Sequence, residues 1–398
     1  MRRNISNYKY VLIFQLLAVC VLAFHPVKDF NYKYIFYPTI LLAVGAVNMF
    51  LNTRMVGFGR HYAIVSMIFS IGVVEIFRLS TEYGFKQIFW FCVGSLLMYI
   101  SYIIIKNIKI FEKMYIYYVA MIFMLFSITL LFGESSGGAK NWIRIFGHLF
   151  QPIEIIKILF IFQLSSSPKI YINKINFHFI NIALTLIYMG LLIIQKDLGS
   201  ALILFAILLA YLIIFEKNKK YFLFTLLSFL LAAFIGYKIL PHVRVRFNTW
   251  LNPFKLYNST GYQIVTALTS MANGGFTGTG LGLGIPNIIP VNISDMIIAC
   301  VVEEMGSFMG IAIVLLYLIF TVDTLFLAKY VKNSFYKQLS VLISSFYIMQ
   351  FMVILLGTLS IIPLTGITAP FLSYGGSSML SSFIMLGILQ ASLRVYNE

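Results

Sequence analysis

Asp295 is the residue whose type and position most clearly suggest chemistry. It stands between a glycine-rich segment and a long apolar run, and no basic residue lies close to it in sequence. A carboxylate without a partner at the mouth of a cavity has the properties of a general base, which takes a proton from a reacting group. The sequence therefore makes Asp295 a candidate catalytic base.

Two further carboxylates stand three residues before a basic residue inside apolar segments. Glu154 precedes Lys157, and Glu75 precedes Arg78. Residues at this spacing share one face of a helix, where opposite charges can pair. Ionisable groups inside a membrane are costly and usually face a cavity or a partner. Each pair therefore fits either an internal salt bridge that joins helices or a functional cavity.

The remaining acidic residues of interest are an adjacent pair of glutamates and an aspartate that follows a lysine. Glu303 and Glu304 follow about two turns into an apolar run, and Asp197 follows Lys196 directly before another run. Lys196 fits two roles equally well, since it could pair with Asp197 or supply a cation to an anionic ligand. We expect one cavity to be lined by Glu154, Lys157, Arg78, Asp197, Glu303 and Glu304.

These residues are rare in a chain that has the composition of a membrane protein. Of its 398 residues, 60% are hydrophobic and 11% are charged, whereas soluble domains have about 45–50% and about 25%. This composition excludes a soluble enzyme, a secreted disulfide scaffold and a disordered chain. Cys20, Cys92 and Cys300 lie within apolar runs and share no metal-binding spacing, so we predict buried thiols and no metal site.

The apolar runs define the elements that must position these side chains. About 20 residues cross a bilayer as a helix, so this composition predicts about twelve spans. With the N-terminus in the cytoplasm, most of the 29 Lys and Arg residues fall in inner loops, as the positive-inside rule requires. The net charge of +16 then needs no nucleic-acid partner. We predict an all-α, polytopic transmembrane bundle with both termini cytoplasmic and with spans near residues 10–25, 34–51, 62–79, 87–105, 115–132, 153–164, 177–194, 198–215, 221–240, 296–320, 339–360 and 376–393.

Two long polar loops lie outside in this orientation, over residues 133–152 and 241–295. A loop as long as the second is usually functional in a compact protein. It contains NGGFTGTGLGLGIPN at 273–287, without the Lys-Ser/Thr or the strand–turn–helix context of a nucleotide-binding loop. The segment fits either a flexible re-entrant turn or a backbone whose amides approach an anionic ligand.

Four separated segments carry a family resemblance. They are GGAKNWIRIFGHLFQPIEIIK at 137–157, QKDLGSA at 195–201, the G-Y-Q to E-E-M-G stretch at 261–306, and PLTGITAPFLSYGGSSMLSSFIMLG at 363–387. In type and order they resemble the SEDS family, the FtsW, RodA and SpoVE proteins of bacterial cell-wall synthesis. The resemblance covers about residues 115–394. It implies a SEDS core over 61–398 preceded by an extension of two transmembrane helices over 1–60, as in the longer subgroup.

The resemblance implies a peptidoglycan glycosyltransferase in the bacterial cytoplasmic membrane. Such an enzyme polymerises lipid II into β-1,4 glycan strands at the outer face and releases undecaprenyl diphosphate, for cell elongation, division or sporulation. The family's essential carboxylate falls on Asp295. A class B penicillin-binding protein, a transpeptidase, is the implied partner, and the only cofactor left open is a divalent cation, Mg²⁺ or Mn²⁺. Outer residues that could bind the substrate and its pyrophosphate are Lys140, Arg144, Lys196, Arg246 and Ser377.

The sequence also departs from the family pattern. Val291 and Ile293 replace a Glu and a His before the catalytic Asp, and Lys196 replaces a Pro. Loss of the His removes a group that could orient or tune the carboxylate. Two alternatives stay open: a lipid II flippase, which also needs many spans and a polar cavity, and a non-catalytic membrane scaffold for a penicillin-binding protein.

Overall fold

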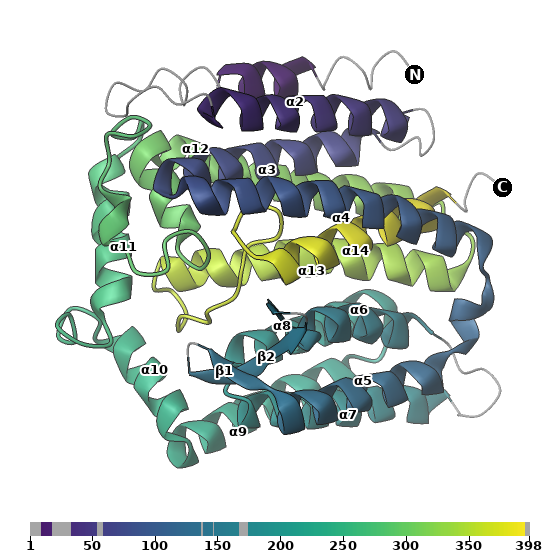
Figure 1. The fold of residues 1–398 in the computed structure, drawn as a ribbon. Helices are drawn as coiled ribbons and strands as arrows, with labels where there is room; N and C mark the ends of the chain where they lie inside the picture. Colours follow the sequence, from purple (N-terminus) through teal and green to yellow (C-terminus); the bar gives the residue numbers. More distant parts are fainter. Residues whose placement is uncertain are drawn as a thin grey trace.

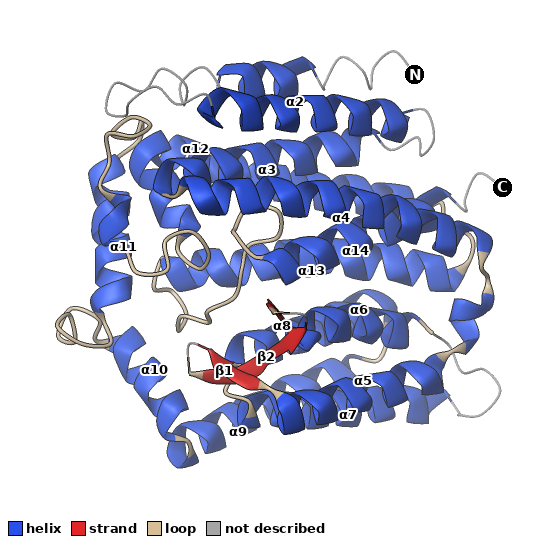
Figure 2. Ribbon diagram, in the orientation of Figure 1, coloured by secondary structure: helices blue, strands red, loops and turns tan. Residues whose placement is uncertain are grey.

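The chain folds almost entirely into helices. The computed structural model describes residues 9–17, 33–53, 59–136, 138–145, 147–166 and 174–394. Within these residues, nine helices are long and apolar enough to cross a membrane (Figure 2). The predicted polytopic helical bundle is therefore confirmed. The first predicted span is described only as a helix over 9–17, and both chain ends lie outside the described residues.

Every other predicted span contains a helix. The α6 helix has 14 residues, about 21 Å at 1.5 Å per residue, so it is shorter than a full crossing. The helices that match predicted spans are α2 (Lys33–Leu51), α3 (Gly59–Leu79), α4 (Thr81–Asn107), α5 (Tyr115–Phe132), α6 (Pro152–Ser165), α7 (Lys174–Ile194), α8 (Leu198–Phe215), α9 (Lys219–Ile239), α12 (Ile297–Ala328), α13 (Ser334–Thr358) and α14 (Gly376–Arg394).

The helices form two packed groups (Figure 1). One group contains α5 to α9, and the other contains α3, α4, α12, α13 and α14. The α13 helix contacts α6 and α8, and α14 contacts α6, so these helices join the groups. The α4 and α14 helices pack closely because Gly387 has no side chain: a Cβ there would overlap the carbonyl oxygen of Met98.

The two predicted outer loops contain regular structure. Residues 133–152 form an antiparallel sheet of β1 (Glu134–Ser136), β2 (Ala139–Ile145) and β3 (His148–Phe150) in the order β1-β2-β3. The long loop 241–295 contains α10 (Pro241–Leu251), α11 (Tyr262–Gly274) and a 3-10 turn, η3 (Pro286–Ile288). Hydropathy missed α10 and α11 because both helices are short and carry polar residues.

A break in α12 lets the glycine-rich segment pack against this helix. Gly306 has φ 81° and ψ 165° within α12, a conformation that glycine adopts without strain. Next to it, Gly278 (φ 84°) lies so close to α12 that a Cβ would overlap the carbonyl oxygen of Glu304. The amides of Thr279 and Gly280 donate to the freed carbonyls of Glu303 and Glu304. The segment is thus fixed to α12, which contradicts the expectation of a flexible turn.

Candidate active site

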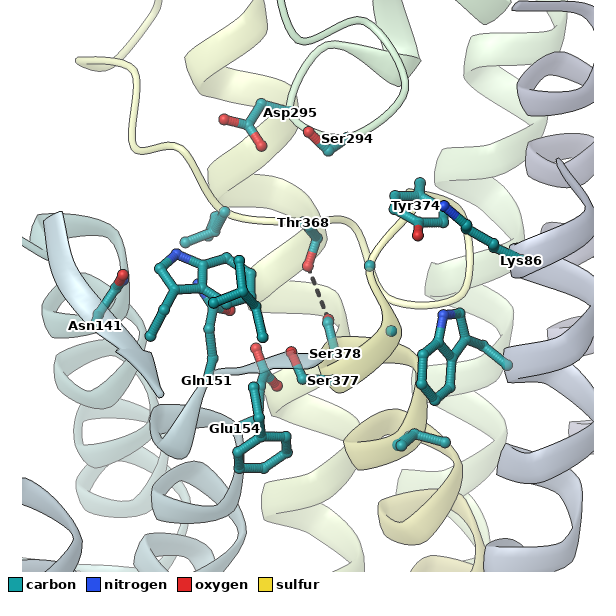
Figure 3. Close-up of a pocket in the computed structure, with 18 of the residues that line it drawn as sticks. Lys86, Asn141, Gln151, Glu154, Ser294, Asp295, Thr368, Tyr374, Ser377 and Ser378 are labelled. Atoms are coloured by element: carbon teal, nitrogen blue, oxygen red, sulfur yellow. Dashed lines mark hydrogen bonds between the residues drawn. The ribbon is translucent and has the colours of Figure 1, made fainter. Parts of the chain in front are cut away.

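A large cavity lies between the two groups of helices. Its volume is about 1230 Å³. Its walls come from α4, from β2, β3 and the start of α6, and from the start of α14 with the loop before it (Figure 3). Of the residues that the sequence singled out, the lining includes Asp295, Glu154, Lys157, Asp197, Arg144 and Ser377. Residues as far apart in sequence as Phe85 and Leu380 therefore contribute to one site.

Asp295 lies in the turn that precedes α12, against the loop that precedes α14. The loop holds this turn through two bonds: Ser373 Oγ donates to the Ser294 carbonyl (2.7 Å), and the Tyr374 amide donates to the Ile293 carbonyl (2.9 Å). A Cβ built on Gly366 would be 3.5 Å from Asp295 Oδ2. The side chain at position 293, where the family has His, is therefore not needed to hold the turn, because its backbone is bonded instead.

The surroundings of Asp295 raise the pKa of its carboxyl group, which suits a group that accepts a proton. Burial raises the pKa of its carboxyl group from 3.8 to about 6, while a hydrogen bond from Ser294 and the charge of Arg246 act in the opposite direction. Among the described residues Asp295 makes no ion pair. A carboxylate with this pKa is largely ionised at pH 7 yet basic enough to accept a proton.

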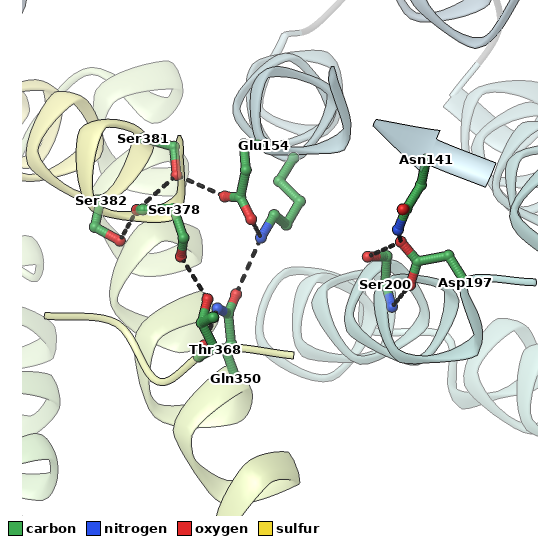
Figure 4. A network of polar contacts seen from close by, with 10 residues as sticks. Asn141, Glu154, Asp197, Ser200, Gln350, Thr368, Ser378, Ser381 and Ser382 are labelled. Carbon is green, nitrogen blue, oxygen red and sulfur yellow. Dashed lines mark hydrogen bonds and ion pairs between the residues drawn. The ribbon is translucent and has the colours of Figure 1, made fainter. Parts of the chain in front are cut away.

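Glu154 and Lys157 form the salt bridge that their spacing predicts. The α6 helix begins at Pro152, a residue suited to the first helical position, and one turn later Lys157 Nζ lies 2.8 Å from Glu154 Oε1. Both side chains are at most 5% exposed. Lys157 also donates to Gln350 Oε1 (3.3 Å), and Ser381 Oγ donates to Glu154 Oε2 (2.6 Å) (Figure 4).

This pair connects to the loop before α14. Gln350 on α13 donates through Nε2 to the Thr368 carbonyl (2.6 Å), and Thr368 Oγ1 donates to Ser378 Oγ (2.8 Å) (Figure 4). Buried polar groups that satisfy one another in this way fix the geometry of their neighbours. The network therefore couples α6, α13 and α14 at the floor of the cavity.

Asp197 does not pair with Lys196. Its carboxylate caps α8 by accepting from the amide (3.0 Å) and hydroxyl (2.9 Å) of Ser200, and it also accepts from Asn141 Nδ2 on β2 (2.9 Å). Lys196 has a positive φ of 62° and an exposed side chain. Of the two roles left open, pairing with Asp197 is excluded among the described residues, and Lys196 is not among the residues that line the cavity.

The other cations expected to bind substrate are each bonded to a carbonyl or a carboxylate of the chain. Lys140 donates to the Leu130 carbonyl at the end of α5 (2.8 Å) and does not line the cavity. Arg144 lines it and pairs with Glu134 on β1 (2.9 Å). Arg246 on α10 donates to the carbonyls of Leu364 and Thr365 (3.0 and 3.1 Å), so it secures the loop beside Asp295 while its charge acts on that carboxylate.

Sequence reasoning missed Lys86 as a cavity residue. Lys86 lies on α4, lines the cavity and pairs with Glu82 one turn earlier (2.6 Å). The i,i+4 spacing of Glu82 and Lys86 is visible in the sequence, but it is the usual pattern of an exposed helix pair. Only the packing of α4 against α14 brings this residue to the site.

Arg78, Glu303 and Glu304, which were expected to line this cavity, are not among its lining residues. Arg78 Nε pairs with Glu304 Oε1 (2.7 Å) instead of with Glu75. Glu75 is fully buried on α3, and its carboxylate has no hydrogen-bond partner among the described residues. The expected Glu75–Arg78 pair is therefore replaced by a bond between α3 and α12.

The amides of the glycine-rich segment also bond to these acidic residues. Gly282 donates to Glu304 Oε2 (2.9 Å), and Ile285 donates to Glu303 Oε1 (3.1 Å). Arg78 closes the arrangement by donating to the Gly284 carbonyl (2.7 Å). The anion that these amides approach is thus a carboxylate of the chain itself, and the cluster fastens the segment to α3 and α12.

The described residues contain no group of three His, Cys, Asp or Glu side chains that could hold a metal ion. Asp197 also has its carboxylate oxygens occupied by Ser200 and Asn141. Within the described ranges, no cluster of side chains could therefore by itself hold the divalent cation that the resemblance left open.

Together these features define a polytopic helical membrane protein with a carboxylate-bearing cavity beside its glycine-rich loop. The chain belongs to the FtsW/RodA/SpoVE family: the family model, described as "Cell cycle protein", matches residues 53–397. It is accordingly a multi-pass protein of the cytoplasmic membrane.

Similar proteins of known name cover different shares of the chain. Peptidoglycan glycosyltransferase RodA of Mycobacterium tuberculosis is 36% identical over 271 residues, which are 64% of this chain and 58% of that protein. RodA of Mycobacterium leprae is 31% identical over 82% of this chain and 75% of its own length. The probable peptidoglycan glycosyltransferase FtsW of Bacillus subtilis is 28% identical over 91% of this chain and 90% of its own.

Solved structures share the fold. A chain from a structure described as structural coordination of polymerization and crosslinking by a peptidoglycan synthase complex has a TM-score of 0.68 and 22% identity, and the match covers 83% of this chain and 96% of that one. Rod shape determining protein RodA of Thermus thermophilus has a TM-score of 0.59 and 20% identity over 84% and 96%.

Proposed function

We propose that this protein is a peptidoglycan glycosyltransferase that polymerises lipid II at the outer face of the cytoplasmic membrane, with Asp295 as the general base. The observation that carries the proposal is the position of Asp295: a half-buried carboxylate that makes no ion pair with the described residues, in the wall of a large cavity, with a pKa raised to about 6. The names of the relatives support the same reaction.

The reaction requires few protein groups. The acceptor sugar hydroxyl attacks the anomeric carbon of the donor, the bond from that carbon to the diphosphate oxygen breaks with inversion, and the diphosphate leaves with the electron pair. Asp295 accepts the proton of the attacking hydroxyl. Cations and backbone amides in the cavity stabilise the charge on the departing diphosphate.

The partner proposed from the resemblance is a class B penicillin-binding protein. The structural neighbour in a complex that coordinates polymerization with crosslinking supports this pairing. Lipid II itself is proposed as the substrate because the cavity combines polar groups for the sugar and diphosphate with a position among membrane-spanning helices.

The test is to incubate the purified full chain, with its cognate partner, in vesicles containing fluorescent lipid II. We expect muramidase-sensitive glycan polymer from the wild type. Asp295→Asn should form almost no polymer. Its matched control is Asp323→Asn, which should polymerise normally because Asp323 lies within α12, is not among the residues that line the cavity and pairs with Arg60. Transport of lipid II across the vesicle membrane without polymer would contradict the proposal and favour a flippase. Partner binding with neither activity would favour a scaffold.

A further inference from the structure

The start of α14 offers a second chemical group to the cavity. Gly375, Gly376, Ser377 and Ser378 all line the cavity at this helix end. The first backbone bond there runs from the Met379 amide to the Gly375 carbonyl (2.8 Å). The amides of Gly376, Ser377 and Ser378 have no acceptor among the described residues. Free amides at a helix start carry the positive end of the helix dipole and favour an anion.

A side chain at the same place also lacks a partner. Ser377 is 9% exposed, and its hydroxyl forms no hydrogen bond within the described part of the chain. In Figure 3 this hydroxyl points from the start of α14 into the cavity, toward Glu154. The serines that follow it are bonded: Ser381 to Glu154 Oε2 and Ser382 to the Ser378 carbonyl. Because this hydroxyl faces the cavity without a partner among the described residues, it is available to bond a ligand.

The glycines keep the amides accessible. A Cβ on Gly376 would be 2.7 Å from the Trp90 ring on α4, so only glycine lets the helix start lie against this indole. Neither Gly375 nor Gly376 has a side chain to cover the free amides.

The charges nearby leave room for an anion. Lys157 on α6 lines the cavity and is nearly buried. Both oxygens of Glu154 are engaged, one with Lys157 and the other with Ser381, so this carboxylate is already balanced.

We propose that the free amides of Gly376, Ser377 and Ser378, the Ser377 hydroxyl and the Lys157 ammonium bind the diphosphate of the lipid-linked donor. This inference rests on the proposed function and adds the position of the leaving group. Tyr374 bonds the loop to the turn that carries Asp295, and Gly376 follows two residues later. One short segment therefore links the base to the anion site. An inverting displacement needs these two groups on opposite sides of the anomeric carbon.

The test measures binding of farnesyl diphosphate, farnesyl monophosphate and farnesol to the purified full chain in detergent by calorimetry. We expect the diphosphate to bind the wild type more tightly than the alcohol. Ser377→Ala should weaken diphosphate binding about tenfold, the usual effect of one lost bond to a charged group, and Ser377→Asp should weaken it further by repulsion. Farnesol binding should not change.

The matched control is Ser392→Ala, a buried serine on the same helix whose hydroxyl donates to the Ile388 carbonyl; it should bind the diphosphate like the wild type. Equal affinity of the Ser377 variants and the wild type, or no preference for diphosphate over farnesol, would overturn the inference. A wrong assignment of the base would be recognised separately. If Asp295→Asn polymerises normally while Ser377→Ala still binds farnesyl diphosphate more weakly, the anion site is supported and the role of Asp295 as base is not.

Discussion

The rate of polymerisation should follow the ionisation of Asp295. Burial raises the pKa of this carboxyl to about 6, and a general base must be ionised to act. A group with that pKa is about nine-tenths ionised at pH 7 and about one-tenth at pH 5, so kcat/KM should fall about tenfold between these values. An ordinary aspartate, with a pKa of about 3.9, would leave the rate almost unchanged over this range.

Ser294 provides a way to move this profile. Its hydrogen bond lowers the pKa of Asp295, so Ser294→Ala should shift the midpoint to higher pH. The assay is the initial rate of lipid II polymerisation between pH 5 and 8, with KM determined at each pH. A flat profile, or a midpoint near 4 that Ser294→Ala does not move, would refute the assignment of the base.

The same pKa has a consequence for stability. Because the folded-state pKa of Asp295 is raised above its ordinary value of 3.8, the ionised form destabilises the fold as pH rises through this window. A shift of about two units corresponds to about 3 kcal/mol at pH 7. Asp295→Asn should therefore unfold at an equal or higher temperature than the wild type at pH 7, and this advantage should disappear below pH 4.

Two further predictions concern the buried ion pair and the glycine-rich segment. Lys157→Met leaves the Glu154 charge buried without a partner, so it should lower the unfolding free energy by about 3–5 kcal/mol and reduce activity. Adding Glu154→Gln should recover part of the stability, and equal melting temperatures for the single and double variants would contradict this. Gly278→Ala should prevent the glycine-rich segment from packing on α12, because its Cβ would overlap the Glu304 carbonyl at a φ of 84°. The control is Gly190→Ala, which meets nothing within 4 Å and should melt like the wild type.

The parts of the fold that follow from local pattern were predictable. Apolar runs located the spanning helices, because the bilayer fixes their length. The Glu154–Lys157 pair followed from its spacing, since both residues lie one turn apart on the same helix. The position of Asp295 at the edge of a cavity was predictable because the residue lies between a polar loop and a membrane-spanning segment.

Long-range pairing could not be read from the sequence. Arg78 has Glu75 at the ideal helical spacing, yet it pairs with Glu304, more than 200 residues later, because α3 packs against α12. The glycine-rich segment suggested a ligand for its amides, and the acceptors proved to be carboxylates of α12. The free amides at the start of α14 were equally hidden, since a Gly-Gly-Ser-Ser sequence does not show which cavity a helix end will face.

Asp295 is proposed to accept the proton of the attacking sugar hydroxyl, and removing its carboxylate tests this role. The most direct measurement is a multiple-turnover assay in which purified wild type and Asp295→Asn, each with its cognate partner, are mixed with excess lipid II and the glycan bonds formed per enzyme molecule are counted over time. We expect Asp295→Asn to form almost no glycan bonds while it still folds, binds its partner and retains farnesyl diphosphate. Glycan formation by Asp295→Asn at the wild-type rate would contradict this role.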